Sequence, residues 1–426
     1  MRKIATSVGL LAMGASVLHA AESSTLNQLQ KNKPWSIQAT LNGFYDDNVN
    51  TAPDAWAVES AGFDVTPSLK FGLPGEQTSF NVGYDFTARF YDKRIPGRDG
   101  HHSYTHTFDL DLAHTFSPRA NLSLSDSFVI GQEPDLLFDP AAIQRVPGDN
   151  LRNFARAEFN IEATDLLSFS LGYNNNYYDY HDELPGGLFL GRASYSGLYD
   201  RTEHLVRVDS NWKLSPSTIG ILGYNYSQTV YNGDEVIAPG VRSADRNNRG
   251  HTVYVGARHI FSPTLSAALN VGAQYYSYYN YTGTDDDTQW SPFVQGSLTY
   301  ALQQRTTVDA GIRYSRESAN EVGSTVVSYV KDMEYVTVYG ALKHEIISKL
   351  IGTVSASAAH AEYNGGGAGL DGETFMLYRI GLDLAYNFNQ YVSAHTGYNF
   401  DRWDSTVRMS PDFYRNRVYA GVTVGF

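Results

Sequence analysis

Apolar and polar residues alternate along almost the whole chain from Trp35 to its end. In the stretch SFNVGYDFTARFY, Phe80 and Val82 fall on one face, and Asn81 and Asp85 fall on the other. A period of two is that of a β-strand, because successive side chains of a strand point to opposite sides of the sheet. These stretches are also rich in valine, threonine, tyrosine and phenylalanine, which favour strands. The sequence therefore predicts an all-β fold.

Short turns interrupt the alternation at regular intervals. Examples are FSPRA at 116–120, LSPST at 214–218 and FSPTL at 261–265, and between them lie longer acidic connections such as DDNVNTAPDAW and NGGGAGLDGE. Short turns at one end and long loops at the other are typical of outer-membrane barrels. We count eight short turns and nine long loops, which predicts a transmembrane antiparallel up-and-down β-barrel of about 18 strands with short periplasmic turns and long extracellular loops. The predicted strands begin near residues 35, 58, 77, 103, 121, 150, 166, 201, 219, 248, 265, 289, 306, 329, 350, 374, 391 and 413.

The two ends of the chain support a barrel that leaves the cytoplasm. Residues 1–20 carry Arg2 and Lys3, then an apolar core, then small residues, which indicates a cleaved signal peptide. Residues 21–34 are then a short periplasmic extension, and residues 35–426 are the barrel in the cell outer membrane, in contact with its lipid. The last strand, VYAGVTVGF, must close against the first, because an open edge in lipid leaves backbone groups unpaired. Its apolar face, with Val422, Val424 and the terminal Phe426, resembles the signal that barrel-assembly machinery reads, which makes that machinery an expected partner.

Composition excludes several classes of function. The chain has 32 basic residues, of which the signal holds two, so the mature chain has 30 against 45 acidic residues, a net charge of −15. This argues against nucleic acid as a partner. There is no cysteine, so neither disulfides nor thiol chemistry is expected. The histidines show no paired metal-ligand spacing, and we predict no cofactor, no metal site and no enzymatic activity.

Charged residues occur on the face of the strands that parity turns inward. A charge facing lipid at mid-depth costs about 2–4 kcal/mol, so the inward position that parity assigns to these residues is also the energetically favourable one. Inward charges can line a wet pore or cross-link the wall through ion pairs, and both roles stay open. The predicted channel-lining residues are Asp85, Arg89, Asp109, Asp111, Arg156, Glu158, Arg207, Asp209, Arg258, Asp309, Arg313, Lys343, Arg379, Asp383, Arg415 and Arg417.

Tyrosines cluster at the outer ends of several strands. The clustered tyrosines, as in YNNNYYDYHD, YNYSQTVY and YYSYYNY, are expected to form the aromatic girdle at the membrane interface. By parity, Tyr178, Tyr276 and Tyr278 point inward, and they are the candidates for stacking against a polysaccharide.

The chain also resembles a known family. YDDNVN at the end of the first strand, LSLSDSF at Leu122–Phe128 after an FSP turn, and the repeated GY pairs within strands are similar to the putative β-barrel porin type 2 proteins of Gram-negative envelopes. The resemblance covers essentially the whole mature chain. It implies a channel for passive diffusion of small polar solutes, or export of a polymer such as an exopolysaccharide. The alternative is a structural or surface-interaction barrel whose lumen is closed by loops. The sequence specifies neither the solute nor the oligomeric state.

Overall fold

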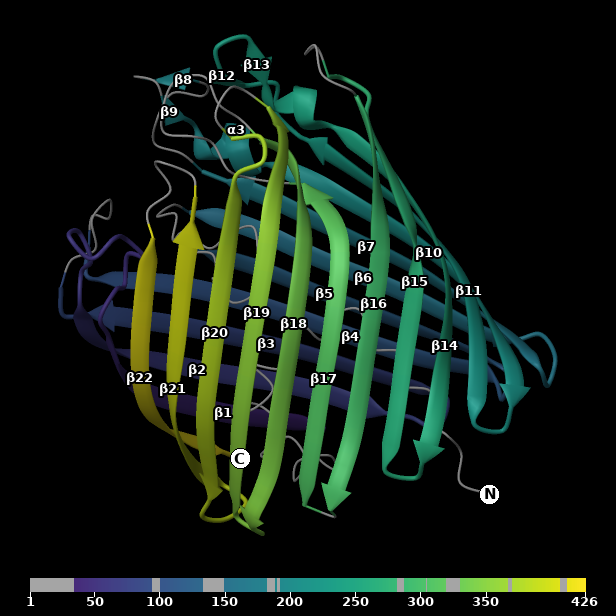
Figure 1. Ribbon diagram of the computed structural model, residues 1–426. Helices are drawn as coiled ribbons and strands as arrows, with labels where there is room; N and C mark the ends of the chain where they lie inside the picture. Colours follow the sequence, from purple (N-terminus) through teal and green to yellow (C-terminus); the bar gives the residue numbers. More distant parts are fainter. Residues whose placement is uncertain are drawn as a thin grey trace.

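The chain forms a closed antiparallel barrel of 18 strands in the computed structural model (Figure 1). The structure describes residues 34–93, 100–132, 149–181, 188–189, 192–281, 287–303, 305–318, 330–366, 370–406 and 412–426, so the predicted signal peptide lies outside the described residues. The barrel closes where the first strand pairs with the last, from Gln38 opposite Gly425 to Asp46 opposite Arg417. The predicted fold class is therefore confirmed.

The wall strands begin within two residues of the predicted positions. They are β1 (Trp35–Asp46), β2 (Ser60–Pro74), β3 (Thr78–Tyr91), β4 (His102–Ser117), β5 (Ala120–Gly131), β6 (Asn150–Glu162), β7 (Leu167–Tyr180), β10 (Arg201–Ser215), β11 (Thr218–Tyr231), β14 (Asn248–Ser262), β15 (Leu265–Tyr278), β16 (Thr288–Gln303), β17 (Thr306–Ser318), β18 (Val330–Ile347), β19 (Leu350–Gly366), β20 (Thr374–Asn387), β21 (Val392–Ser405) and β22 (Phe413–Gly425). Short turns join them at the lower and right-hand edges of Figure 1, and long loops join them at the upper and left-hand edges.

The long loops contain the remaining elements. These are the short strands β8 (Leu188–Phe189), β9 (Arg192–Ala193), β12 (Val236–Ala238) and β13 (Val241–Arg242), the helix α3 (Tyr195–Tyr199) and the 3-10 turn η1 (Ser243–Arg246). Among the residues that the structure describes, no helix is both long enough and apolar enough to cross a membrane.

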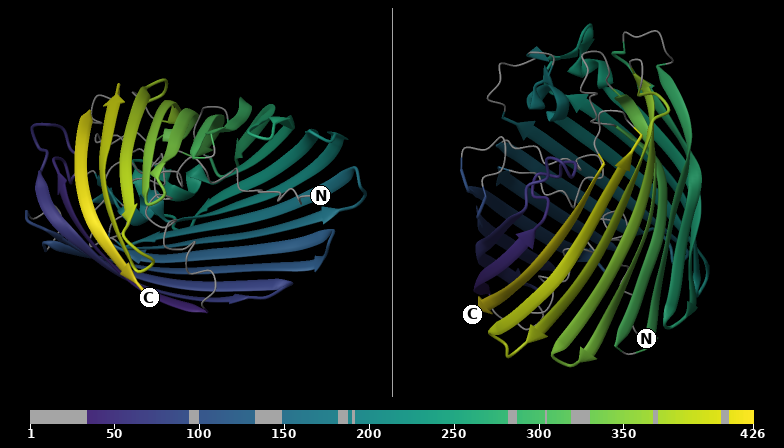
Figure 2. Two further views of the ribbon diagram at one scale, coloured as in Figure 1. Left: turned by 90° about the horizontal axis from the view of Figure 1, so that it is seen from below. Right: turned by 60° about the vertical axis from the view of Figure 1, so that its left-hand side comes forward.

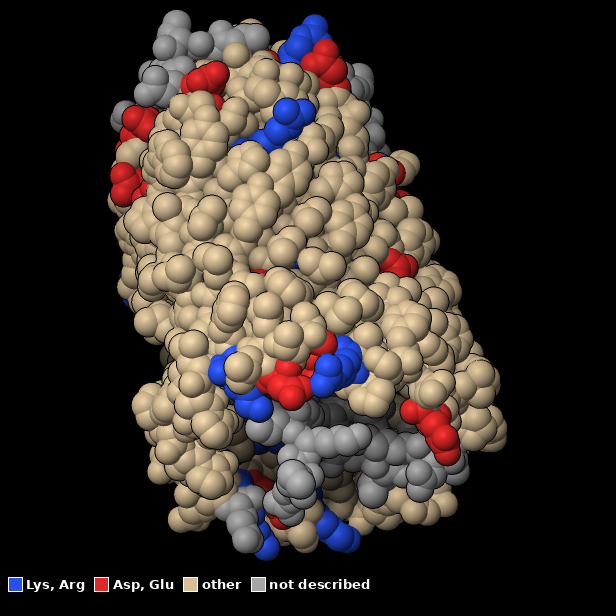
Figure 3. All heavy atoms as spheres, turned by 90° about the vertical axis from the view of Figure 1, so that its right-hand side faces the viewer, with Lys and Arg blue, Asp and Glu red and all other residues tan. Residues whose placement is uncertain are grey.

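The outer face of the barrel is apolar. Leu41, Val255 and Leu269 each leave more than half of their surface exposed. In the view of Figure 3, most charged side chains lie above and below a broad middle belt that is nearly free of them. Since polar and apolar residues alternate, the charged members of the same strands face the interior, and Figure 2 shows from below how the strands surround that interior.

Tyrosines on the inner face lie over glycines of the neighbouring strand. Tyr254 on β14 is opposite Gly223 on β11, and its hydroxyl donates to Asp209 on β10, one strand further. A Cβ atom on Gly223 would lie 2.1 Å from the Tyr254 ring. Tyr419 on β22 reaches over Gly397 on β21 in the same way. Glycine is required at these positions because the ring occupies the place of a side chain.

This packing predicts that Gly223→Ala destabilises the barrel. The added methyl group must displace the Tyr254 ring, and overpacking of this kind costs about 1–3 kcal/mol. The measurement is the temperature at which the folded species disappears from gels run without boiling. Gly43→Ala is the control, because the nearest atom to its added Cβ is a backbone oxygen at 3.9 Å. Equal transition temperatures for the two variants would contradict this packing account.

Candidate functional site

The sixteen charged residues predicted to line the channel all lie on the inner face of the wall. Arg207 and Asp209, for example, alternate with the outward Val206 and Val208, which are 38% and 36% exposed. The same alternation with exposed apolar residues holds on β3, β4, β6, β14, β17, β18, β20 and β22. Whether ions pass these residues stays a prediction.

Many of the inner charges are paired across strands. Arg89 contacts Asp64 at 2.6 Å, and Arg417 contacts the same carboxylate at 3.6 Å. Arg415 contacts Asp46 at 2.6 Å, and Arg379 contacts Asp401 at 3.8 Å. The acidic partners Asp46, Asp64 and Asp401 were missing from the sequence prediction. Their inward parity was visible, but only the register between strands shows which arginine each one meets.

The other predicted residues differ in their surroundings. Two of the acidic residues accept a hydrogen bond from a hydroxyl group: Asp309 from Thr299 at 2.7 Å, and Asp383 from Tyr419. Arg313 forms an ion pair with Glu317 at 2.7 Å. Arg156 donates to the neutral Asn174 at 3.2 Å. Within the described part of the chain, no hydrogen bond or ion pair is made by the side chains of Asp85, Asp109, Asp111, Arg258 and Lys343. Among the sixteen predicted residues, these five are the ones whose charge no described group of the wall pairs.

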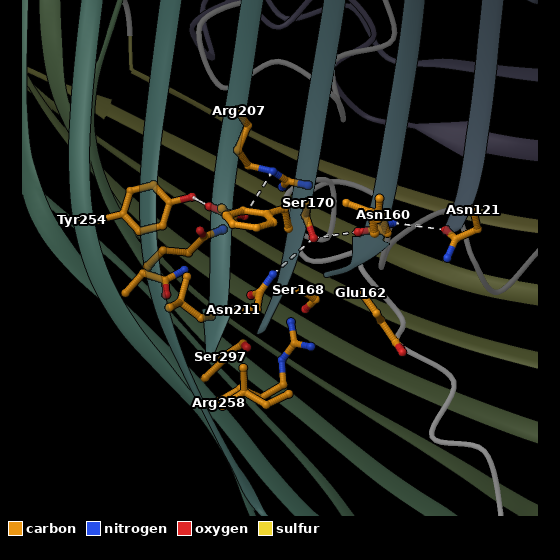
Figure 4. Close-up of a pocket in the computed structure, with 18 of the residues that line it drawn as sticks. Asn121, Asn160, Glu162, Ser168, Ser170, Arg207, Asn211, Tyr254, Arg258 and Ser297 are labelled. Carbon is orange, nitrogen blue, oxygen red and sulfur yellow. Dashed lines mark hydrogen bonds and ion pairs between the residues drawn. The ribbon is translucent and has the colours of Figure 1, made fainter. Parts of the chain in front are cut away.

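A pocket lined by both polar and apolar groups opens from the lumen between β5–β7 and β14–β16 (Figure 4). It encloses about 1100 Å³, part of which is open lumen. A chain of side-chain hydrogen bonds crosses its wall. Asn160 donates to Asn121 at 3.3 Å, Ser170 donates to Asn160 at 2.6 Å, and Asn211 donates to Ser170 at 3.3 Å. The pocket therefore presents fixed amide and hydroxyl groups from five strands, counting Tyr254 on β14.

Two charged side chains in this pocket, Arg258 and Glu162, have no described hydrogen-bond or ion-pair partner. Arg207 lies between Glu158 at 3.3 Å and Asp209 at 3.4 Å, and Tyr254 donates to Asp209 as well. Arg258 has no described partner, and its side chain projects into the pocket in Figure 4. The pocket thus combines neutral hydrogen-bonding groups with an unpaired guanidinium and, in Glu162, an unpaired carboxylate.

At the extracellular end, the wall parts between β16 and β17. Pairing runs from Gln303 opposite Thr306 up to Val294 opposite Tyr314 and stops there. Both strands continue, β16 upward to Thr288 and β17 to Ser318, and Figure 1 shows the end of β17 bending away from β16. The described strand β16 keeps only its partner β15 over 288–293.

The end of β17 packs against the inner face of β15. The backbone nitrogen of Arg316 donates to Gln274 at 2.9 Å, and the Tyr276 hydroxyl donates to the backbone oxygen of Arg316 at 2.9 Å. Both β15 residues have inward parity, because Leu269 and Val271 on the same strand are exposed. The ends of β17 and of its partner β18 are therefore turned into the mouth of the barrel.

A buried polar cluster holds these ends in place. The Arg316 guanidinium contacts Asp332 and also Glu334, the latter at 2.7 Å. The Tyr278 hydroxyl donates to Asp332 at 2.5 Å, and Tyr314 donates to Glu334. Arg316 and Asp332 are 4% and 0% exposed. We call these five residues the latch.

The inward tyrosines predicted as stacking surface are all in contact with protein groups. Tyr276 and Tyr278 contact the turned-in strand ends, and the Arg201 guanidinium lies 4.0 Å from the centre of the Tyr178 ring. Their inward parity is as predicted, but these contacts leave no reason to prefer them as stacking surface for a polysaccharide. Tyr254, which lines the pocket, is the aromatic side chain that the sequence analysis missed.

An apolar cluster fills the inner side of the wall next to the latch. It joins the extracellular ends of β18–β22, and inward side chains such as Tyr335, Phe375 and Trp403 are almost fully buried in it. Phe375 and Trp403 stack with ring centres 4.0 Å apart. The mouth of the barrel is therefore narrowed by wall strands and their side chains, whereas the sequence analysis considered only loops for this role.

The helix α3 lies at the extracellular end near an acidic group with a shifted pKa. Asp200 ends the helix and accepts from the backbone nitrogen of Tyr180 at 2.7 Å. Burial, together with the nearby Asp179 and Glu235 carboxylates, raises the pKa of Asp200 to about 7 even though the Tyr180 N–H lowers it. A raised carboxyl pKa favours the protonated folded form, so the stability of this region falls as the pH rises from about 4 towards 7.

Residues 335–426, from within β18 to the end of the chain, match the family "Putative beta-barrel porin 2". The resemblance seen in the sequence is thereby confirmed over these residues. Among curated proteins, none matches the chain in sequence.

Several solved outer-membrane barrels are similar to the chain in structure. OccAB4 of Acinetobacter baumannii has 13% identity and a TM-score of 0.46, covering 93% of this chain and 100% of its own. OccK1 (OpdK) of Pseudomonas aeruginosa has 12% identity and a TM-score of 0.48, covering 92% and 99%. The FrpB iron transporter of Neisseria meningitidis has 10% identity and a TM-score of 0.46, covering 94% and 84%. At identities of 10–13%, these similarities concern the fold alone. We therefore infer the function of this chain from the side chains that line its own lumen.

Proposed function

We propose that this protein is an outer-membrane channel through which small polar solutes diffuse. The observation that carries the proposal is the lumenal pocket, whose wall presents Asn121, Asn160, Ser170 and Asn211 in one hydrogen-bonded chain beside an unpaired Arg258. Amide and hydroxyl groups exchange hydrogen bonds with hydroxylated solutes, and a guanidinium binds an acidic group. The match to a porin family over residues 335–426 supports the same class of function.

Two other functions compete with this one. Export of a polymer needs a continuous wide path, and the narrowed mouth argues against it in the conformation described here. A purely structural barrel is favoured by the many cross-strand ion pairs, because they cross-link the wall without serving transport. The pocket favours the channel, because a wall built only for stability gains nothing from an unpaired arginine.

The proposal predicts that Arg258→Ala makes the channel more selective for cations. Removing the unpaired guanidinium leaves no other group unsatisfied, so the fold is expected to be unchanged. The reversal potential across a salt gradient should shift in the cationic direction by several millivolts, and more at low salt, where the screening length grows from about 10 Å at 0.1 M to about 30 Å at 0.01 M.

Two further variants separate a lumenal effect from a general effect of charge. Arg258→Lys keeps the charge and should keep the native reversal potential. Arg402→Ala removes the same charge from the outer face, where Arg402 pairs with Asp404 at 2.9 Å, and should cause no shift. An unchanged reversal potential in a conducting Arg258→Ala variant contradicts a role for this residue in the path of ions.

A further inference from the structure

We propose that the extracellular ends of β17 and β18 are a gate built from the barrel wall. In the structure they are turned inward and held by the latch; when released, they straighten and β17 pairs with β16. The gate rests on the proposed channel function, because it controls the way between the pocket and the outside. Three observations support the gate: the unpaired edge of β16, the contacts of the latch, and the register in which β16 and β17 pair below it.

The upper edge of β16 is suited to remaining unpaired. Ala301 donates its backbone N–H to the backbone oxygen of Thr264, the residue before β15. Backbone N–H groups point alternately to the two neighbouring strands, so the nitrogen of Pro292 faces β17. Proline has no N–H, and it is found in sheets where a strand edge is free. An ordinary residue at position 292 would present an unsatisfied donor whenever β17 is turned inward.

Four of the five latch residues, those on β17 and β18, have the parity of lipid-facing positions, whereas Tyr278 on β15 has inward parity. Arg316 shares its face of β17 with the exposed Ile312, and Glu334 shares its face of β18 with the exposed Val338. They are buried only because both strand ends turn inward. In straight strands they would face outward at the level of Trp290, which is 69% exposed on β16. Charges near the membrane interface cost only about 0–1 kcal/mol, so the straight conformation is not excluded by lipid.

The register of the paired part defines the open conformation. Val294 lies opposite Tyr314, and continuing this register upward places Ser291 opposite Glu317. Opening therefore exchanges the side-chain contacts of the latch for ladder hydrogen bonds between β16 and β17. It also removes both strand ends from the mouth. Because Pro292 has no N–H, this ladder contains one hydrogen bond fewer than a regular ladder, which favours the closed form.

The first test weakens the latch and records conductance in planar bilayers. Arg316→Met leaves Asp332 and Glu334 without their shared cation, and Tyr278→Phe removes one hydroxyl from Asp332. We expect the open probability to rise several-fold in Arg316→Met and by a smaller factor in Tyr278→Phe. The second variant keeps the test decisive if the first does not fold.

The matched control is Arg201→Met. Arg201 is an arginine of similar burial, 4% exposed, at the extracellular end of β10, and it contacts Glu203 at 2.7 Å. Its strand stays paired with both neighbours up to this residue. We expect its open probability to be that of the native protein. An equal rise in Arg201→Met and Arg316→Met would overturn the gate, because it would indicate general loosening of the barrel.

The second test detects the open conformation without conductance. The chain has no cysteine, so Ser291→Cys combined with Glu317→Cys gives one pair of thiols. Residues directly opposite in an antiparallel ladder have Cα atoms about 4.5–5.5 Å apart, which suits a disulfide. We expect the pair to oxidise several-fold faster when Tyr278→Phe is added, as measured by loss of maleimide labelling. An unchanged rate overturns the gate, whereas a faster rate in a barrel that never conducts supports the movement and refutes the channel.

Discussion

Asp46→Ala is expected to prevent stable closure of the barrel. Asp46 on β1 binds the buried Arg415 guanidinium of β22 through both carboxylate oxygens, at 2.6 to 3.1 Å. Its loss leaves a buried cation without its main partner, since Asp401 lies 3.7 Å away. Breaking a buried pair in this way costs about 3–5 kcal/mol. The measurement is the denaturant concentration at which half of the refolded protein loses its folded gel mobility.

Two variants test whether the unpaired charge is the cause. Asp46→Leu combined with Arg415→Met removes both charges and should recover most of the lost stability, because apolar residues can replace a buried pair at little cost. Asp165→Ala removes an acidic residue from an exposed pair with Arg119 at a periplasmic turn, and it should leave the midpoint unchanged. A double variant as unstable as Asp46→Ala alone would contradict the explanation.

Deleting Phe426 is expected to lower the yield of folded barrel in the outer membrane several-fold. The backbone of Phe426 exchanges two hydrogen bonds with Ile37 of β1, at 2.9 and 3.2 Å, so the last residue takes part in closing the barrel. Its ring lies 5.8 Å from that of Tyr391 on the outer surface. Deletion removes these contacts together with the end of the predicted assembly signal.

The comparison for Phe426 is a substitution at the neighbouring residue. Phe426→Asp places a charge on the outward face next to Val424, whereas Gly425→Asp places it on the inward face. We expect the first to reduce the folded yield much more than the second when both are extracted from outer membranes. Equal yields would show that neither the ring nor its outward position matters for assembly.

The strands and their faces were predictable from the sequence because lipid imposes a strict rule. Each wall residue faces either lipid or the lumen, so alternation alone assigned Arg207 inward and Val208 outward, as the structure has them. The strand starts were predictable for a related reason, since proline- and glycine-containing turns interrupt the alternation. The alternation does not show which residues of neighbouring strands lie opposite each other. The contacts of Arg415 with Asp46 and of Tyr254 with Gly223 required the register.

The turned-in mouth was not predicted, because a polar run at the end of a strand is also expected where a long loop begins. Residues 315–318 are all polar, so the apolar/polar alternation stops where β17 leaves the wall. The local signals were Arg316, Asp332 and Glu334, three charges at lipid-facing parity, and Pro292 within a strand. Each of these is unfavourable in a continuous wall, and together they mark the place where the wall parts.

The pocket was predictable only in part. Arg207, Asp209 and Arg258 were assigned to the lumen from their charge and parity. The amide and hydroxyl groups beside them, such as Asn160 and Ser170, have the same parity but resemble any other polar residue of a barrel strand. Their convergence depends on the depth of each residue in the wall, which follows from the stagger of neighbouring strands.

The most direct test of the channel is the current through purified, refolded protein in a planar bilayer. We expect discrete conductance steps from the native protein, and more frequent steps from the Arg316→Met variant. Steps that do not change in that variant would contradict the gate alone. If both proteins are folded by gel mobility and inserted in the bilayer, yet neither carries any current, the channel is contradicted and the structural barrel is the better account.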